Sequence, residues 1–268
     1  MDRTSGMDSA TEKSIIALDR WLQSPAGVYV RAFEQACLDE LTVDIFGYNA
    51  LQIGVPQLDA LAASRMPNKW QVATRPSTRA ELALAPEGRQ IAVGVDFAEL
   101  PFATASLDLV VLPHVLEFAS EPHQVLREVE RVLIPEGQII ICGFNPASLW
   151  GARQGVGRVT RSDYLPESGE FISMPRLKDW LKLLNLGVTR SHFGCYAPPC
   201  RTAQWLSRFS MLESAGRRWW PYLGAVYVVH AIKRVKGMRI IGPAWNKKAS
   251  KRRAAVPAAN RNERTTSK

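Results

Sequence analysis

Two aspartates and one histidine border short apolar runs, where side chains of these types can bind a ligand or move a proton. Asp96 follows the run Gln90–Val95, Asp108 lies at the start of the run Leu107–Leu112, and His114 comes just after that run. An ionised carboxylate only accepts hydrogen bonds, so Asp96 suits a ligand that presents an amino group. An imidazole titrates near neutrality, so His114 suits a general base. Two alternatives stay open: Asp96 caps the following loop, or His114 packs its ring and bonds a backbone carbonyl.

The segments that would position these residues alternate between strand and helix. The apolar runs predict strands over Asn49–Gly54, Trp70–Thr74, Gln90–Val95, Leu107–Leu112, Gln138–Phe144, Val188–Tyr196 and Ala225–Lys233. Helical periodicity predicts helices over Glu12–Gln23, Val28–Leu41, Asp59–Ser64, Glu121–Leu133, Pro175–Leu186 and Thr202–Arg217. The glycine-rich segment Asn145–Gly157 is expected to be a connector with a possible lid. Such alternation predicts an α/β fold with a parallel sheet and right-handed crossovers.

The composition places most of the charge at the end of the chain. The 268 residues are 46% hydrophobic and carry a net charge of +9, of which +7 belongs to Lys247–Lys268. This tail has no apolar periodicity, so we expect it to be disordered. It either binds nucleic acid weakly or only aids solubility.

The remaining composition predicts a cytoplasmic protein without a membrane partner. Four cysteines in a chain of this length indicate reduced thiols, and the polar start lacks the apolar region of a secretory signal. The apolar stretch Tyr222–Ile232 is shorter than the roughly 20 residues that span a bilayer. The composition gives no oligomeric state.

The motifs around Asp96 and Asp108 resemble one family closely. The segment Val93–Phe102 reads VGVDFAELPF, and a Leu-Asp-Leu-Val-Val run follows at Leu107–Val111. This pattern is similar to that of the class I S-adenosylmethionine-dependent methyltransferases, type 11 family, from about Leu51 to Phe144. The block Leu126–Pro146, LREVERVLIPEGQIIICGFNP, resembles a group of small bacterial methyltransferase-like proteins. The resemblance implies a Rossmann-like doubly wound sheet of about seven strands, the last antiparallel, flanked by helices.

The resemblance also implies a site for S-adenosylmethionine at the carboxyl ends of the strands. Asp96 would accept a hydrogen bond from the adenine amino group, and Phe97 would lie against the adenine ring. Pro113 and His114 would line the crevice after the fourth strand, with His114 as the catalytic base. Gln52 and Gly54 would belong to the first loop. No metal is implied, because His192, Cys195 and Cys200 match no zinc spacing.

The first loop departs from the family pattern. Gly54 keeps the first of its glycines, Pro56 stands where the second belongs, and Gln52 replaces an acid. No carboxylate occurs between Asp59 and Glu81, where the family holds the ribose hydroxyl groups. The sequence therefore predicts a methyltransferase of unidentified acceptor. The alternative is a catalytically degenerate member of the fold that acts as a binding or regulatory module.

The expected organisation follows from these assignments. Residues 1–11 are a flexible start, 12–48 N-terminal helices, 49–144 the cofactor-binding core, 145–245 the C-terminal part of the same domain, and 246–268 the basic tail. Trp219–Tyr222 beside Arg217 and Arg218 is expected to pack in a core or an interface, and stacking on nucleic-acid bases is the alternative. Glu117 is expected to lie in a solvated turn.

Overall fold

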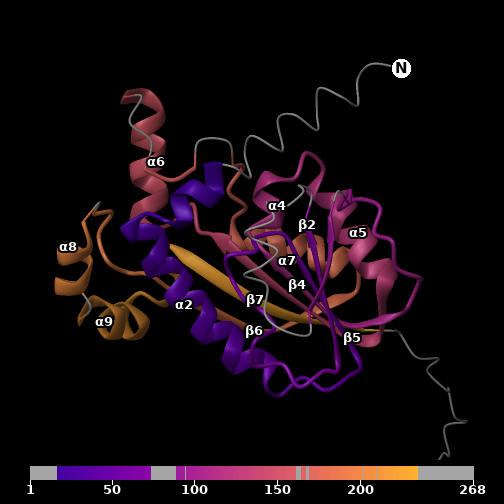
Figure 1. The fold of residues 1–268 in the computed structure, drawn as a ribbon. Helices are drawn as coiled ribbons and strands as arrows, with labels where there is room; N and C mark the ends of the chain where they lie inside the picture. The colour runs from indigo at the N-terminus through magenta and orange to yellow at the C-terminus, as the bar shows by residue number, and fades with distance from the viewer. Residues whose placement is uncertain are drawn as a thin grey trace, which may run out of the picture. The chain divides into compact units, whose positions relative to one another are not determined.

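The computed structural model describes residues 17–73, 89–93, 95–160, 164–166, 169–200, 202–209 and 211–234. Seven strands within these residues form one sheet in the order β3-β2-β1-β4-β5-β7-β6 (Figure 1). The strands are β1 (Asn49–Ile53), β2 (Asn68–Ala73), β3 (Arg89–Val93), β4 (Leu107–Pro113), β5 (Leu133–Phe144), β6 (Leu186–Gly194) and β7 (Val226–Lys233). Strands β1 to β5 are parallel, and β7 is antiparallel to β5 and β6. The predicted α/β sheet with an antiparallel last strand is confirmed.

Helices cover both faces of this sheet. They are α2 (Pro25–Thr42), α4 (Val115–Phe118), α5 (Pro122–Val132), α6 (Leu149–Thr160), α7 (Met174–Leu183), α8 (Ala203–Arg208) and α9 (Met211–Trp219), with the 3₁₀ helix η1 (Pro221–Leu223). Residues 17–22 are helical as well. None of the described helices is long and apolar enough to cross a membrane.

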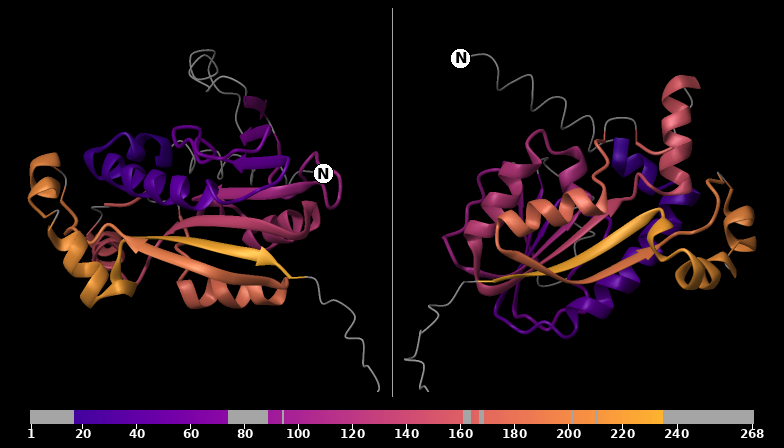
Figure 2. Two further views of the ribbon diagram at one scale, coloured as in Figure 1. Left: turned by 90° about the horizontal axis from the view of Figure 1, so that it is seen from below. Right: turned by 180° about the vertical axis from the view of Figure 1, so that it is seen from behind.

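Two buried clusters lie on opposite faces of the sheet. On one face, α2 packs residues such as Val30 and Leu38 against Leu109 and Ile140. On the other face, α5 and α7 pack residues such as Val129 against the neighbouring strands. Figure 2 shows α2 and α7 on opposite sides of the strands. Each fully buried valine or leucine contributes about 1.5–3 kcal/mol relative to an exposed one, so these two layers fix the strands that carry the site.

The start of α2 explains an apparent break in the sequence pattern. The run Ser24–Gly27 was expected to interrupt two helices, but it opens the longer one. The Ser24 hydroxyl accepts a hydrogen bond from the Gly27 amide, and Pro25 occupies the first turn. A serine cap followed by proline is a typical helix start, because that turn has unpaired N–H groups. Helix α2 therefore begins three residues before the predicted helix.

Three local predictions are wrong. No helix forms over Asp59–Ser64, although this segment links two parallel strands. The expected connector Asn145–Gly157 instead contains most of α6, and Gly151 is required there, because an added Cβ would lie 2.3 Å from the Pro146 carbonyl oxygen. The predicted helix Thr202–Arg217 is the two helices α8 and α9.

The ends of the chain lie mostly outside the described residues. The predicted flexible start, the first part of helix Glu12–Gln23 and the basic tail all fall there. The described residues all belong to one compact unit, Met1–Val235. The predicted domain boundaries stay predictions.

Candidate functional site

The strand order defines the place where ligands bind in sheets of this kind. Strand β1 has β2 on one side and β4 on the other, and all three are parallel. The chain moves outward from β1 to β2 and β3 and then returns to β4, so the strand order reverses between β1 and β4. The crevice at the carboxyl ends of the strands at such a switch point is the usual ligand site.

Gly54 brings three segments together at this switch point. Its φ of +74° lies in the left-handed region, and its amide donates a hydrogen bond to the Val72 carbonyl at 2.8 Å. An added Cβ would lie 3.1 Å from Val115 Cγ2 and 4.0 Å from Phe97 Cζ. A larger residue would suffer both backbone strain and a close contact. The ends of β1 and β4 and the loop after β3 therefore meet at one glycine.

Gln52 holds the loop that follows Gly54. Its side chain is fully buried, and its amide nitrogen donates to the carbonyls of Val55 at 3.0 Å and Leu58 at 2.7 Å. Its amide oxygen accepts from the Ala60 amide at 3.0 Å. These bonds fix a loop that has no helix to support it. The predicted contact of Gln52 with the cofactor stays a prediction, and the observed bonds give the side chain a positioning role.

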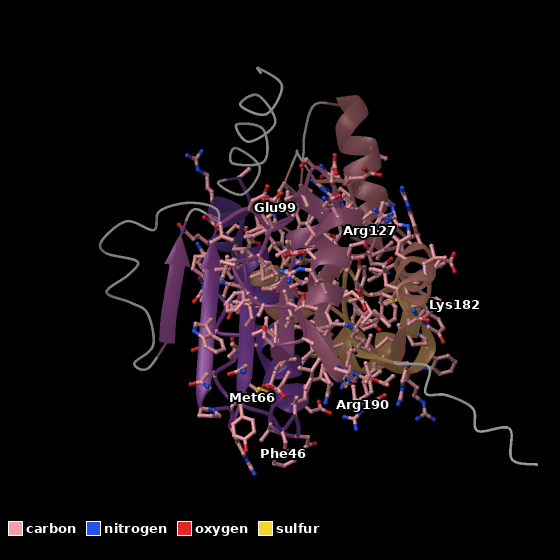
Figure 3. All side chains as sticks on the ribbon, turned by 90° about the vertical axis from the view of Figure 1, so that its right-hand side faces the viewer. Phe46, Met66, Glu99, Arg127, Lys182 and Arg190 are labelled. Atoms are coloured by element: carbon pink, nitrogen blue, oxygen red, sulfur yellow. The ribbon has the colours of Figure 1, made fainter. Side chains whose placement is uncertain are left out.

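Asp96 and Phe97 follow β3 and face different surroundings. Asp96 is exposed, and its carboxylate accepts a hydrogen bond from the Ala98 amide at 2.9 Å, as the capping alternative predicted. Phe97 is 7% exposed and reaches the Gly54 contact. In Figure 3, Glu99 of the same loop lies at one end of the strands and Phe46 at the other. The exposed carboxylate of Asp96 thus stands beside the switch point and can still meet a ligand.

Asp108 lies at the start of β4, whereas Asp96 follows the end of β3, so the two aspartates lie at opposite ends of the parallel strands. One of its carboxylate oxygens accepts hydrogen bonds from the amides of Tyr48 at 3.0 Å and Asn49 at 2.9 Å. These contacts join the start of β4 to the start of β1. The two aspartates of the motif therefore have separate tasks, and Asp108 is structural.

The loop after Asp96 is clamped from α5. The Glu128 carboxylate accepts from the Leu100 amide at 2.8 Å, and the Arg131 guanidinium donates to the Phe102 carbonyl at 2.9 Å. Arg131 and Glu128 also pair with each other at 2.7 Å. The hydrogen bond from Arg131 lowers the pKa of the Glu128 carboxyl. This clamp gives the Leu-Pro-Phe part of the motif a defined position beside the site.

Pro113 and His114 end β4 in a strongly constrained turn. Pro113 is buried and lies opposite Cys142 in the parallel pairing of β4 with β5. His114 has a left-handed φ of 52°, and its amide donates to the Cys142 carbonyl at 3.0 Å. This turn starts the short helix α4, whose first residue, Val115, contacts Gly54. The backbone of His114 therefore places Val115 against Gly54 at the crevice.

The His114 side chain turns into the protein between two glutamates. Its Nδ1 lies 2.8 Å from Glu117 Oε2, and its Nε2 lies 2.8 Å from Glu34 Oε1 of α2. The contact with Glu34 is close enough for an ion pair but lacks the angles of a hydrogen bond. The other Glu117 oxygen accepts from the Phe144 amide at 2.5 Å, and the imidazole lies on the Phe144 ring with centroids 4.3 Å apart. All three titratable side chains are buried.

The electrostatics of this cluster argue against the role predicted for His114. Burial alone would lower the pKa of the imidazole, but the charge of Glu34 and the hydrogen bond to Glu117 raise it to about 10. Burial also raises the pKa of the Glu117 carboxyl. A protonated, fully buried imidazole has no lone pair to accept a proton from a substrate. The ring instead acts as a cation that holds α2, α4 and the end of β5 together.

The sequence did not reveal the two glutamates of this cluster. Glu117 is buried, so its expected place in a solvated turn is wrong. Glu34 carried a signal, because it shares the buried face of α2 with Val30 and Leu38. A carboxylate within an apolar helical stripe needs a buried partner. His114 is that partner, but the pairing depends on tertiary structure.

A cavity of about 370 Å³ lies elsewhere, between α2, β6, α9 and η1. Phe33 and Cys37 of α2 line it, with His192 and Tyr222 on the other side. None of the predicted site residues borders this cavity. Burial, together with nearby Glu40, raises the pKa of the Cys37 thiol to about 12, so this thiol is not an activated nucleophile. Among the described residues, no group of acidic, histidine and cysteine side chains is suited to hold a metal ion.

Comparisons with known proteins agree with the observed topology. A family model described as a methyltransferase domain, of type 11, matches residues 66–141. An uncharacterized protein of Escherichia coli, YafS, is 31% identical over 180 residues, which span 66% of this chain and 68% of YafS. The structure of a methyltransferase from Thermotoga maritima covers 82% of this chain and all of its own, with a TM-score of 0.57 and 14% identity.

A second methyltransferase structure, from Mesorhizobium loti, covers 74% of this chain and 96% of its own, with a TM-score of 0.54 and 15% identity. These structural likenesses concern the fold alone. Together with the matched family model and the relative in Escherichia coli, they agree with the resemblance of the motifs. The chain belongs to the class I S-adenosylmethionine-dependent methyltransferases of the type 11 family.

Proposed function

We propose that this protein transfers a methyl group from S-adenosylmethionine to an acceptor that is not yet identified. The observation that carries this proposal is the meeting of Gly54, Val115 and Phe97 at the switch point between β1 and β4. A left-handed glycine at this place lets a ligand approach the backbone closely. The family membership supports the same cofactor.

The residues present can hold this cofactor in a definite way. The exposed Asp96 carboxylate would accept a hydrogen bond from the adenine amino group, and Phe97 would supply the apolar contact to the ring. The backbone at Gly54 would lie next to the methionine part. Gln52 would keep the loop after Gly54 in place, since its amide already bonds three backbone groups of that loop.

The chemistry requires orientation more than proton transfer by this chain. When bound, S-adenosylmethionine supplies a methyl group on a positively charged sulfur, open to attack by an acceptor lone pair. Holding the acceptor in line with the carbon–sulfur bond can supply much of the rate. His114 is already paired with two carboxylates, so the acceptor has to lose any proton to another group or to water.

The alternative function is a catalytically degenerate module of the same fold. The reason for this alternative is that the first loop departs from the family pattern: Gln52 stands in place of an acid and Pro56 in place of a glycine. The match to the methyltransferase family model does not favour this alternative. Cofactor binding separates the two functions.

Isothermal titration calorimetry with S-adenosylmethionine and S-adenosylhomocysteine tests the proposal. Asp96→Asn keeps an oxygen for the Ala98 amide but removes the charged acceptor, so affinity should fall about 10- to 100-fold. Glu99→Gln is the matched control, because this exposed acid belongs to the same loop, and affinity should not change. Gly54→Val should abolish binding. No saturable binding at millimolar cofactor, or equal binding by all variants, would reject the proposal.

A further inference from the structure

The segment α8–α9–η1 exposes large apolar side chains that the site does not use. Met211 is 82% exposed, Trp219 71%, Trp220 57% and Tyr222 69%. The Trp219–Tyr222 run was predicted to pack in a core or an interface; the exposure excludes the core, and the interface stays a prediction. Contiguous apolar groups of this size on a surface usually mark an interaction site.

The inner face of α9 is nevertheless firmly held. Glu213 accepts a hydrogen bond from the Tyr29 hydroxyl of α2 and another from the Tyr196 amide. Gly216 is buried against Tyr196, since an added Cβ would lie 2.3 Å from its ring. The exposed side chains therefore lie on the outer face of an anchored helix and on the turn after it.

The exposed charged side chains in the described part of this segment are all positive. Arg208, Arg217 and Arg218 are exposed. Glu213 is the one acid between residues 202 and 223, and its carboxylate is turned inward to the bonds just described. The exposed part of this segment thus combines aromatic groups with arginines. Arg217 also borders the cavity beside α2, where its charge acts on Glu213, so Arg208 and Arg218 are the arginines without an acid of this segment beside them.

Helix α8 has the same character. Trp205 is 51% exposed, and the Arg208 guanidinium lies 5.2 Å from the centroid of its ring. Figures 1 and 2 show α8 and α9 side by side beyond the carboxyl end of β6. The exposed aromatic, aliphatic and arginine side chains of these two helices and η1 are here called the aromatic–arginine surface (Trp205, Arg208, Met211, Arg217–Trp220, Tyr222 and Leu223).

We propose that the aromatic–arginine surface binds peripherally to an anionic lipid bilayer. Tryptophan and tyrosine favour the boundary between headgroups and acyl chains, and arginines are attracted to anionic headgroups. The sequence predicted no membrane partner because no segment is long enough to span a bilayer. A surface contact needs no span, and Met211 with Leu223 adds the aliphatic groups that enter the acyl boundary.

The charge pattern favours lipid over two other occupants. A second copy of the same surface would bring the three arginines of one chain against those of the other. Single-stranded nucleic acid would use the rings for stacking but would leave Met211 and Leu223 without a role. An anionic bilayer satisfies the arginines and the apolar groups together.

Co-sedimentation of the full-length protein with phosphatidylcholine vesicles, with and without 30% phosphatidylglycerol, tests this proposal. Arg217→Gln/Arg218→Gln should weaken binding to the anionic vesicles by about 25-fold, because each arginine near such a surface contributes about fivefold. Trp219→Ser/Trp220→Ser should weaken it at least about tenfold, since two aromatic anchors are lost. Phe46→Ser/Tyr48→Ser is the matched control, because these aromatic residues are at least as exposed and lie just before β1, away from α8, α9 and η1.

Each outcome decides the proposal. Anionic-lipid binding that the two surface variants lose and the control retains supports it. No binding to either vesicle overturns it, and so does binding that all variants share, which would assign the effect to Lys247–Lys268. If light scattering shows a dimer that the two surface variants lose, and no lipid is bound, the aromatic–arginine surface would belong to a second copy. If an oligonucleotide binds in preference to lipid and the two surface variants lose that binding, the aromatic–arginine surface would belong to nucleic acid. Unchanged circular dichroism ensures that each variant is folded.

Discussion

Replacing His114 should destabilise the protein in a way that depends on pH. The His114→Gln variant leaves the buried carboxylates of Glu34 and Glu117 without their shared cation. Removing one partner of a buried ion pair typically costs about 3–5 kcal/mol, because the remaining charge stays desolvated. The Phe144 amide donates a hydrogen bond to Glu117, so the same substitution should also disturb this bond.

The raised pKa of His114 leads to a similar loss of stability, because the same two glutamates cause it. Its folded value of about 10 exceeds the ordinary 6.5 by more than three units, which corresponds to about 5 kcal/mol when the imidazole is charged in both states. Because the folded pKa is raised, this stabilisation is complete below pH 6.5. It is lost as the pH rises toward 10, since the unfolded chain then no longer binds the proton. The raised pKa of Glu117 acts in the same direction.

Urea denaturation followed by tryptophan fluorescence measures this effect. Between pH 7 and pH 9 the free energy of unfolding should fall by about 2–3 kcal/mol more in the unaltered protein than in His114→Gln. His123→Gln is the control, because His123 is exposed, and it should retain the full pH dependence. The triple variant Glu34→Gln/His114→Gln/Glu117→Gln should recover much of the lost stability, because neutral groups are cheaper to bury. Identical pH profiles for the unaltered protein and His114→Gln, or a loss below about 1 kcal/mol, would refute the cluster's proposed role.

Three further predictions test other parts of the structure. Burial, with the nearby charge of Arg190, lowers the pKa of His230 to about 4. Its imidazole should therefore titrate near pH 4 by NMR, and the free energy of unfolding should fall as the pH drops from 6.5 toward 4. A titration midpoint near 6.5 would contradict this. Arg131→Ala removes the hydrogen bond to the Phe102 carbonyl, so amide exchange between residues 96 and 102 should accelerate about fivefold or more, and unchanged protection would exclude the clamp. Trp150→Ala should cost about 3–5 kcal/mol in chemical denaturation, because this ring is 1% exposed and its indole donates to the Ala197 carbonyl; a cost below about 1 kcal/mol would refute its core role.

Most of the sheet could be predicted from the sequence because its central strands contain apolar runs that turn residues separate. The predicted fourth strand, Leu107–Leu112, differs from β4 by one residue, and the last strand, Ala225–Lys233, differs from β7 by one. Their type depends on local apolar runs, which the sequence shows directly. The strand Gln138–Phe144 begins five residues earlier in the structure, because Leu133 pairs with Leu107 ahead of a register shift.

Long-range contacts explain most of what the sequence could not predict. Helix α6 contains three glycines, so its propensity is low, yet Gly151 allows the close approach to Pro146 that starts it. The segment Asp59–Ser64 has helical spacing, but the buried amide of Gln52 bonds the backbone of Leu58 just before it and of Ala60 within it instead. In both places tertiary contacts override local preference.

The sequence could predict where the candidate residues lie in the fold, but only part of what surrounds them; their roles toward a ligand stay predictions. Gly54, Asp96 and Phe97 gather near the switch point, as expected from residues that follow parallel strands. The resemblance to the family also suggested His114, but the ring direction depends on φ at that residue and on Glu34 from a distant helix. A sequence shows which residue ends a strand, but it does not show toward which face the next side chain turns.

Hydrogen exchange with and without S-adenosylhomocysteine is the most direct measurement of the central claim. The account predicts that the ligand slows exchange at the amides of Gly54, of residues 96–98 and of Val115, which border the switch point. Peptides over the cavity near His192 and Tyr222 should remain unchanged and serve as an internal control. Protection confined to that cavity, or no protection at saturating ligand, would contradict the assignment of a cofactor site between β1 and β4.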